Sequence, residues 1–145
     1  MSTRRIVVGV DGSPGSRAAL LWAADEAMAR EAEIEAVMAY DFGLAWIDVG
    51  SDAQARFIES ATKKAQESLH QVLAEVLPEP RPVAVHPVVV EGAPAAVLVE
   101  MSRNAELLVV GTRGRGGFTG LLLGSVSQRC VERSPCPVVV VPIPA

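Results

Sequence analysis

The segment from Gly111 to Ser125 holds the residues of this chain that are best suited to chemistry. It reads Gly-Thr-Arg-Gly-Arg-Gly-Gly-Phe-Thr-Gly-Leu-Leu-Leu-Gly-Ser, between an apolar run and a predicted helix. Glycine tolerates positive φ and lets a ligand approach the main chain closely. A helix N-terminus offers free N–H groups and partial positive charge to an anion. Ser125 adds a hydroxyl that can cap the helix or contact a phosphate oxygen. A nucleotide suits this arrangement best.

Two common nucleotide-binding loops are excluded by the residues themselves. A Walker A loop needs Gly-Lys-Ser/Thr, and the only lysines, Lys63 and Lys64, are far from any glycine cluster. The fingerprint G-x-G-x-x-G fails because Thr119 stands where the third glycine is required after Gly114–Gly116. What remains is a longer spacing over Gly111–Ser125: glycine, two residues, glycine, nine residues, glycine and serine.

This spacing is similar to the ATP-binding motif of the universal stress protein family. Arg5–Ser13, Arg-Ile-Val-Val-Gly-Val-Asp-Gly-Ser, resembles the family's opening strand with its aspartate, and Cys136–Val141 resembles its closing strand. Because the resemblance covers essentially the whole chain, we interpret residues 1–145 as a single domain. It implies a five-stranded parallel sheet of order 3-2-1-4-5, ATP with Mg²⁺ as ligand, and a homodimer.

Asp11 is the one carboxylate expected near the glycine segment. Because Gly12 follows it, Asp11 can be a plain turn residue. A carboxylate at the carboxyl end of a strand can also accept hydrogen bonds from ribose or hold Mg²⁺ through water. The resemblance favours ribose, and it places Ala39 beside the adenine. In the implied strand order, Asp11 and Gly111 would meet at the switch point between the first and fourth strands.

The remaining candidate residues divide between the base and the phosphates. The resemblance implies that backbone atoms of Gly9, Val10 and Val110 line the same pocket as Ala39. On the phosphate side, arginine can pair with phosphate charge, although a loop arginine is often only solvated. First-turn N–H groups can bind an anion or simply start a helix. The phosphate candidates are Gly111, Arg113, Gly114, Gly124, Ser125, Val126 and Ser127.

Composition narrows the function classes further. The chain has 145 residues and a net charge of −4, which disfavours a nucleic-acid surface. No apolar run approaches the roughly 18 residues that span a bilayer, and the N-terminus shows no signal-peptide pattern. Cys130 and Cys136 are too few for a disulfide framework and are expected to be reduced, in a cytoplasmic protein. Neither His70 nor His86 belongs to a cluster with metal-ligand spacing.

The predicted elements alternate between strand and helix. The first helix, starting at Ser13–Pro14, is expected to turn Leu20, Ala24 and Met28 inward, with Leu21 and Ala27 beside them. Alternation favours right-handed βαβ crossovers, and hence an open, Rossmann-like α/β sheet with helices on both faces. Strands are predicted at 6–10, 34–40, 83–90, 107–110 and 138–141. A loop is predicted at 41–52, followed by a helix that carries Phe57 and ends at Val76, and later helices at 94–101 and 125–133.

We interpret the chain as an adenine-nucleotide-binding protein with a regulatory rather than a catalytic role. Phosphoryl transfer needs a positioned base or water-orienting group, and the glycine segment contains no carboxylate or histidine. A slow ATP hydrolase and an interaction module that binds no nucleotide stay open as alternatives. The sequence also leaves open ATP, another adenine nucleotide or cyclic AMP as the ligand. The apolar strand 137–141 is expected at a sheet edge, where it would join two copies.

Overall fold

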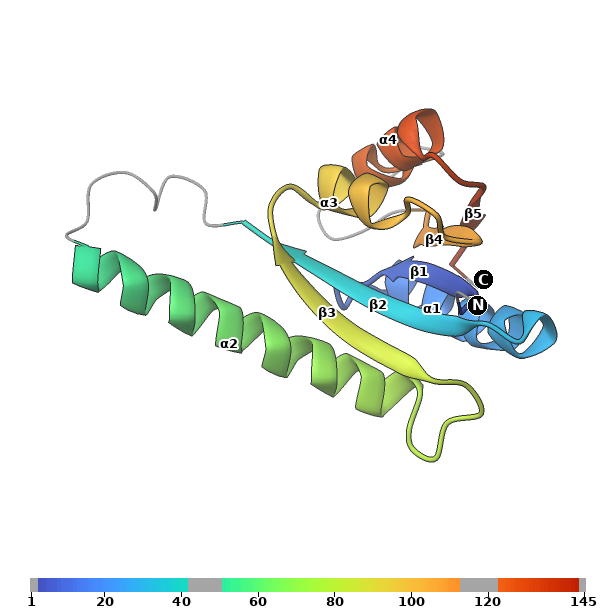
Figure 1. Cartoon of the computed structure of the whole chain (residues 1–145), viewed down its shortest axis with the longest axis horizontal. Coiled ribbons are helices and arrows are strands. Elements are labelled where there is room, and N and C mark those ends of the chain that lie inside the picture. The colour runs from blue at the N-terminus through green and yellow to red at the C-terminus, as the bar shows by residue number, and fades with distance from the viewer. Residues whose placement is uncertain (1–2, 42–50, 113–122, 144–145) are drawn as a thin grey trace.

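The computed structural model describes residues 3–41, 51–112 and 123–143, and their strands and helices alternate as predicted. All strand pairs are parallel, and the sheet order is β3-β2-β1-β4-β5 (Figure 1). This confirms the predicted fold class and strand order. The strands are β1 (Arg5–Gly9), β2 (Glu33–Tyr40), β3 (Val85–Glu91), β4 (Leu107–Gly111) and β5 (Val138–Val141). The helices are α1 (Pro14–Arg30), α2 (Ser51–Val76), α3 (Pro94–Met101) and α4 (Ser125–Arg133).

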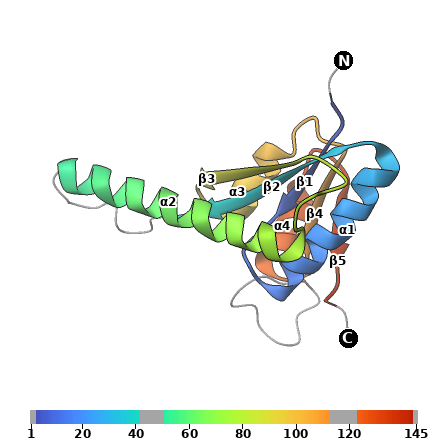
Figure 2. The same cartoon turned by 90° about the horizontal axis from the view of Figure 1, so that it is seen from below.

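Helices cover both faces of the sheet (Figures 1 and 2). On one face, buried residues of α1 and α2 pack with Ile6, Ile34 and Val109. On the other face, α3 and α4 contribute Leu98 and Cys130 to a second buried cluster. The central strands are therefore buried on both sides, which explains why they read as continuous apolar runs.

The inner face of α1 differs from the prediction. Leu20, Ala24 and Ala27 are buried as expected, but Leu21 and Met28 are 54% and 53% exposed. With 3.6 residues per turn, Met28 points about 80° away from the direction of Leu20, eight residues earlier, and Leu21 about 100° away. Both side chains therefore lie outside the sheet-facing stripe, whose small alanines let the helix approach the strands closely.

Helix α2 is longer than the part of the sheet that it covers. Its N-terminal half extends beyond the strands (Figures 1 and 2). Its fully buried positions begin only at Ala65 and continue with Leu69 and Val72, whereas Phe57 is 47% exposed. The helical spacing was predicted correctly, but the start of burial depends on where the sheet ends.

Arg5 connects the start of β1 to the end of α3. Its guanidinium donates to the backbone oxygens of Met101 at 2.8 Å and Arg103 at 2.7 Å. It also forms an ion pair with the half-buried Glu35 of β2 at 3.1 Å. These contacts satisfy carbonyls at the C-terminus of α3, where cations are favoured, and hold that helix against the sheet.

Candidate functional site

The carboxyl ends of β1 and β4 lie side by side at the centre of the sheet. The register pairs Val8 with Val109, so Gly9 and Val110 follow on adjacent strands. The connections from β1 and β4 lead to helices on opposite faces, α1 and α4, which makes this junction the topological switch point. Open α/β sheets bind ligands at the carboxyl ends of strands at such a point.

Asp11 shapes the turn that joins β1 to α1. Its Oδ1 accepts a hydrogen bond from the Ser13 N–H at 2.9 Å, and Gly12 has φ of 80°. The Asp11 N–H donates to Ser16 Oγ at 3.3 Å, and Ser13 caps α1 by accepting from the Ser16 N–H at 3.2 Å. The turn interpretation of Asp11 therefore holds, and the residue is half-buried at the junction where a ribose ligand is predicted.

Gly111 is required by a close contact between backbones. A Cβ atom at this position would lie 2.6–2.8 Å from the C, O and Cα atoms of Gly15 in the first turn of α1. Any larger residue would force α1 away from β4. A Cβ at Gly9 would instead meet a methyl of Leu98 at 2.8 Å, on the opposite face of the sheet.

The predicted base-binding residues are divided between the two faces of the sheet. Ala39, near the end of β2, packs with Val110 in the cluster beneath α3 and α4, and Val126 packs there too. Val10 belongs to the cluster beneath α1 and α2. The side chains of Ala39 and Val110 thus share the α3 and α4 face, whereas Val10 can reach that face only through its backbone.

The N-terminus of α4 has no side-chain cap. The N-cap residue is Gly124, with φ of −74° and ψ of 171°, and Ser125 is the first helical residue. Of the two roles considered for the Ser125 hydroxyl, helix cap and phosphate contact, the cap is not observed, because the chain enters the helix one residue earlier. The first backbone bond of the helix runs from the Gln128 N–H to the Gly124 carbonyl at 2.9 Å. Among the described residues, no hydrogen bond engages the exposed Ser125 hydroxyl or the N–H groups of Ser125 and Val126.

Ser127 faces inward and contacts both ends of the glycine segment. Its hydroxyl lies 2.9 Å from the carbonyl oxygen of Thr112 and 3.0 Å from that of Gly124. The Gly124 N–H also donates to the Thr112 carbonyl at 2.6 Å. Nothing in its residue type marked Thr112 as the acceptor in this contact. Arg113 and Gly114, two predicted phosphate ligands, lie outside the described residues.

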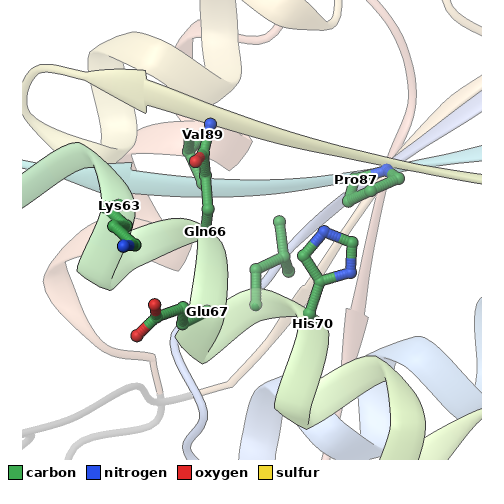
Figure 3. Close-up of a pocket in the computed structure, with 7 residues that line it drawn as sticks. Lys63, Gln66, Glu67, His70, Pro87 and Val89 are labelled. Carbon is green, nitrogen blue, oxygen red and sulfur yellow. The ribbon is translucent and has the colours of Figure 1, made fainter.

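A groove lies elsewhere, between α2 and β3 (Figure 3). It has a volume of about 440 Å³ and was not anticipated from the sequence. It is separated from the junction of β1 and β4 by β2. Its lining includes Lys63, Gln66, Glu67 and His70 of α2 and Pro87 and Val89 of β3.

Other chemistry has little support in the described part of the chain. Within residues 3–41, 51–112 and 123–143, no three His, Cys, Asp or Glu side chains gather as a metal site would need. Burial raises the pKa of the Cys130 thiol to about 11, so this cysteine stays protonated and unreactive near neutral pH. Every helix in these residues is too short or too polar to span a bilayer.

Fold and switch point together define a Rossmann-like α/β protein. The sequence matches the Universal stress protein family across residues 2–142. A universal stress protein of Mycolicibacterium smegmatis is 41% identical over 140 residues, which make up 94% of this chain and 45% of that protein. One from Mycobacterium tuberculosis is 41% identical over 139 residues, 93% of this chain and 44% of that protein. The chain belongs to the universal stress protein family, and it spans less than half the length of these curated relatives.

Solved structures agree with this assignment. The universal stress protein UspA from Lactobacillus plantarum has a TM-score of 0.76 at 20% identity, covering 97% of this chain and 99% of that one. A universal stress protein crystallised in complex with cAMP has a TM-score of 0.72 at 28% identity, covering 99% of this chain and 100% of that one. The five-stranded architecture is thus the fold of this family.

Proposed function

We propose that the chain binds an adenine nucleotide, with ATP as the first candidate, and that the phosphates lie at the N-terminus of α4. The observation that carries this proposal is the missing side-chain cap of α4 at the switch point. The N–H groups of Ser125 and Val126, which donate to none of the described residues, suit a phosphate. By contrast, α1 is capped by Ser13. The related protein crystallised with cAMP, at 28% identity, supports an adenine nucleotide.

The adenine would lie over the ends of β1, β2 and β4 on the α3 and α4 face. Ala39 and Val110 offer apolar contacts there, and the lack of a side chain at Gly9 leaves room close to the backbone. Backbone atoms of Val10 would complete this part of the pocket. Asp11 would accept hydrogen bonds from the ribose hydroxyls, because it is the carboxylate at the end of β1.

The phosphates would be held by a combination of backbone and side-chain donors. Ser125 would donate its hydroxyl, and Arg113 and Gly114 would contribute from the glycine segment. Gly124, which has no side chain, would let a phosphate approach the start of α4 closely, and Gly111 would let the end of β4 lie close to α1. Mg²⁺ prefers oxygen ligands and retains several waters, so phosphate oxygens and water would hold it, with Asp11 near enough to contribute through water.

We infer a regulatory role, in which nucleotide occupancy is the signal. Efficient phosphoryl transfer needs a base or a water-orienting group beside the γ-phosphate. The motif supplies glycines, arginines and hydroxyls, and Asp11, the carboxylate at the end of β1, is assigned to ribose. Steady-state ATPase turnover should therefore stay well below about 1 per second. Turnover at or above that rate would establish a hydrolase instead.

The decisive experiment identifies and then measures the ligand. Mass spectrometry of small molecules released from freshly purified protein should detect an adenine nucleotide. Calorimetry with ATP, AMP and cAMP should then rank their affinities. Gly124→Val and Gly114→Val should abolish binding while the far-ultraviolet circular dichroism stays native-like. Unchanged affinity in both variants would refute this placement of the phosphates.

We also propose a homodimer that pairs through β5. Leu108 of β4 donates to the Pro137 carbonyl at 3.0 Å, and Thr112, directly after β4, donates to the Val141 carbonyl at 3.1 Å. Because backbone groups alternate sides along a strand, the N–H and C=O groups of Val138 and Val140 point to the open edge. A two-fold axis at Val139 would pair these groups antiparallel and close the edge in both copies. No charged residue between 135 and 145 opposes this contact.

Two broader proposals concern the whole chain. Residues 1–145 form one domain, because strands from both ends of the described sequence pair in one sheet. The protein acts in the cytoplasm, consistent with the free thiols of Cys130 and Cys136. Limited proteolysis, which should leave one resistant core, and fractionation of cells that express the chain would test these proposals separately.

A further inference from the structure

We propose that Ser127 is a positioning residue for the nucleotide site. Its hydroxyl contacts the carbonyls of Thr112 and Gly124, near the two ends of the glycine segment, and we call this contact the clasp. Ser125, rather than Ser127, would then contact the phosphate. This inference rests on the proposed nucleotide binding, but its structural part can be tested without a ligand. It assigns different roles to two serines that are two residues apart in the same helical turn.

The two hydroxyls have opposite environments. Ser127 is 3% exposed, and its oxygen lies within hydrogen-bond distance of two carbonyls, those of Thr112 and Gly124. Ser125 is exposed, and its hydroxyl makes no hydrogen bond to any described residue. A serine hydroxyl has a single proton to donate, so the two carbonyls share it. Ser127 is thus engaged within the protein, and Ser125 is available to a ligand.

The clasp links α4 to the central sheet. The Thr112 N–H donates to Val141 of β5 at 3.1 Å, while the Thr112 carbonyl accepts from Gly124 at 2.6 Å and from Ser127. Thr112 is thereby held at the sheet, and the start of α4 is held to Thr112. The uncapped N–H groups of α4 are therefore fixed relative to the ends of β1 and β4, where the rest of the site lies.

Holding these N–H groups in place affects affinity, because each group that becomes ordered only on binding costs conformational entropy and weakens binding. A site whose donors are held in place loses less freedom on binding, so it binds more tightly with the same contacts. Removing the Ser127 hydroxyl would leave the buried carbonyl of Gly124 and the part-buried carbonyl of Thr112 with one donor fewer. A single lost hydrogen bond of this kind corresponds to about a three- to tenfold change in an equilibrium constant.

The first measurement uses the ligand-free protein. In Ser127→Ala, the hydrogen exchange of the Gly124 amide, followed by NMR, should accelerate about three- to tenfold, because the clasp that protects it is weakened. Ser127→Thr retains the hydroxyl, so its Gly124 amide should exchange as slowly as that of the parent protein. Gln128→Ala, on the solvent side of the same helix, is the matched control and should leave it unchanged. Unaltered Gly124 exchange in Ser127→Ala would overturn the clasp whatever the protein binds.

The second measurement is calorimetric affinity for ATP with Mg²⁺. Ser127→Ala should bind about three- to tenfold more weakly, and Ser127→Thr should recover the affinity. Ser125→Ala should also weaken binding but leave Gly124 exchange as in the parent. Faster exchange in Ser127→Ala with unchanged affinity would overturn the positioning role. A parent protein that binds no adenine nucleotide would refute the proposed function, while the exchange data would still decide whether the clasp exists.

Discussion

Gly111 illustrates how one residue can serve a motif and the packing of the fold together. Its missing Cβ allows the Gly15 backbone to approach the end of β4. We expect Gly111→Ala to lower the free energy of unfolding by about 1–3 kcal/mol, because backbone atoms cannot rotate away as a side chain can. Gly9→Ala is the control, since its Cβ would meet the mobile end of Leu98, and it should cost less. Urea denaturation followed by circular dichroism distinguishes them; equal losses would contradict this explanation.

Asp11 has a structural contact that must be separated from its proposed contact with ribose. Asp11→Asn keeps an oxygen that can accept the Ser13 N–H, but removes the charge. We expect it to bind ATP about tenfold to hundredfold more weakly, because a hydrogen bond to a charged group contributes roughly 1.5–3 kcal/mol. Calorimetry with Mg²⁺ and with EDTA would show whether the loss depends on the metal. Parent-like affinity would reduce Asp11 to a turn residue.

For individual residues, the sequence predicts which ones lie near the candidate site, but not the direction in which each side chain points. The spacing from Gly111 to Ser125 correctly located a strand end and a helix start. It could not show that Gly124 rather than Ser125 is the N-cap, because a shift of one residue leaves the pattern unchanged. Nor could it indicate that Ser127 faces Thr112, since that contact joins residues brought together only by the folded chain.

Arg5 fixes α3 relative to the sheet, and with it Leu98 beneath Gly9. We expect Arg5→Ala to lower the free energy of unfolding by about 1.5–3 kcal/mol, because it would leave the carbonyls of Met101, which is part-buried, and of Arg103, which is exposed, without a charged donor. Arg4→Ala is a matched control, since that side chain is 61% exposed and its ion pair with Glu106 contributes little. Thermal and urea unfolding measure both variants. A loss as large in Arg4→Ala would argue against a specific role for Arg5.

The order and type of the elements could be read from the sequence because apolar runs, prolines and glycines mark them locally. The faces of the helices could not be read as well. On α1, Met28 is as hydrophobic as a core residue but lies on the exposed side, whereas small alanines form the buried stripe. Helix burial depends on the position of the neighbouring strands. Local spacing carries no information about that position.

The assembly of the whole molecule depends on what each edge of the sheet exposes. In the proposed dimer, Val140→Pro should shift the equilibrium toward monomer, because it removes an outward N–H and keeps the bonds between β4 and β5. Val140→Ala is the control for the loss of side-chain packing and should remain dimeric. Sedimentation equilibrium at micromolar concentrations measures both variants. A monomeric parent protein would contradict the dimer itself.

The opposite edge of the sheet contains a proline, which removes one hydrogen-bond donor from it. Ile34 of β2 donates to the Ala84 carbonyl at 2.9 Å, and Gly92 donates to Tyr40 of β2 at 2.8 Å, so even-numbered positions of β3 face β2. Pro87 therefore occupies an outward position, where its missing N–H weakens no bond within the sheet but removes a donor from the open edge.

Restoring that donor should give the molecule two edges that can pair. In Pro87→Val, a copy already paired through β5 could pair with the β3 edge of another copy. Two different pairing edges on each copy would form open chains rather than a closed dimer. We expect species larger than a dimer in sedimentation velocity, increasing with concentration, while the free energy of unfolding stays within about 0.5 kcal/mol of the parent. Pro82→Val, an exposed position before β3, should assemble like the parent protein. If Pro87→Val also stops at the parent's assembly state, charge or shape at this edge, rather than the missing donor, keeps it unpaired.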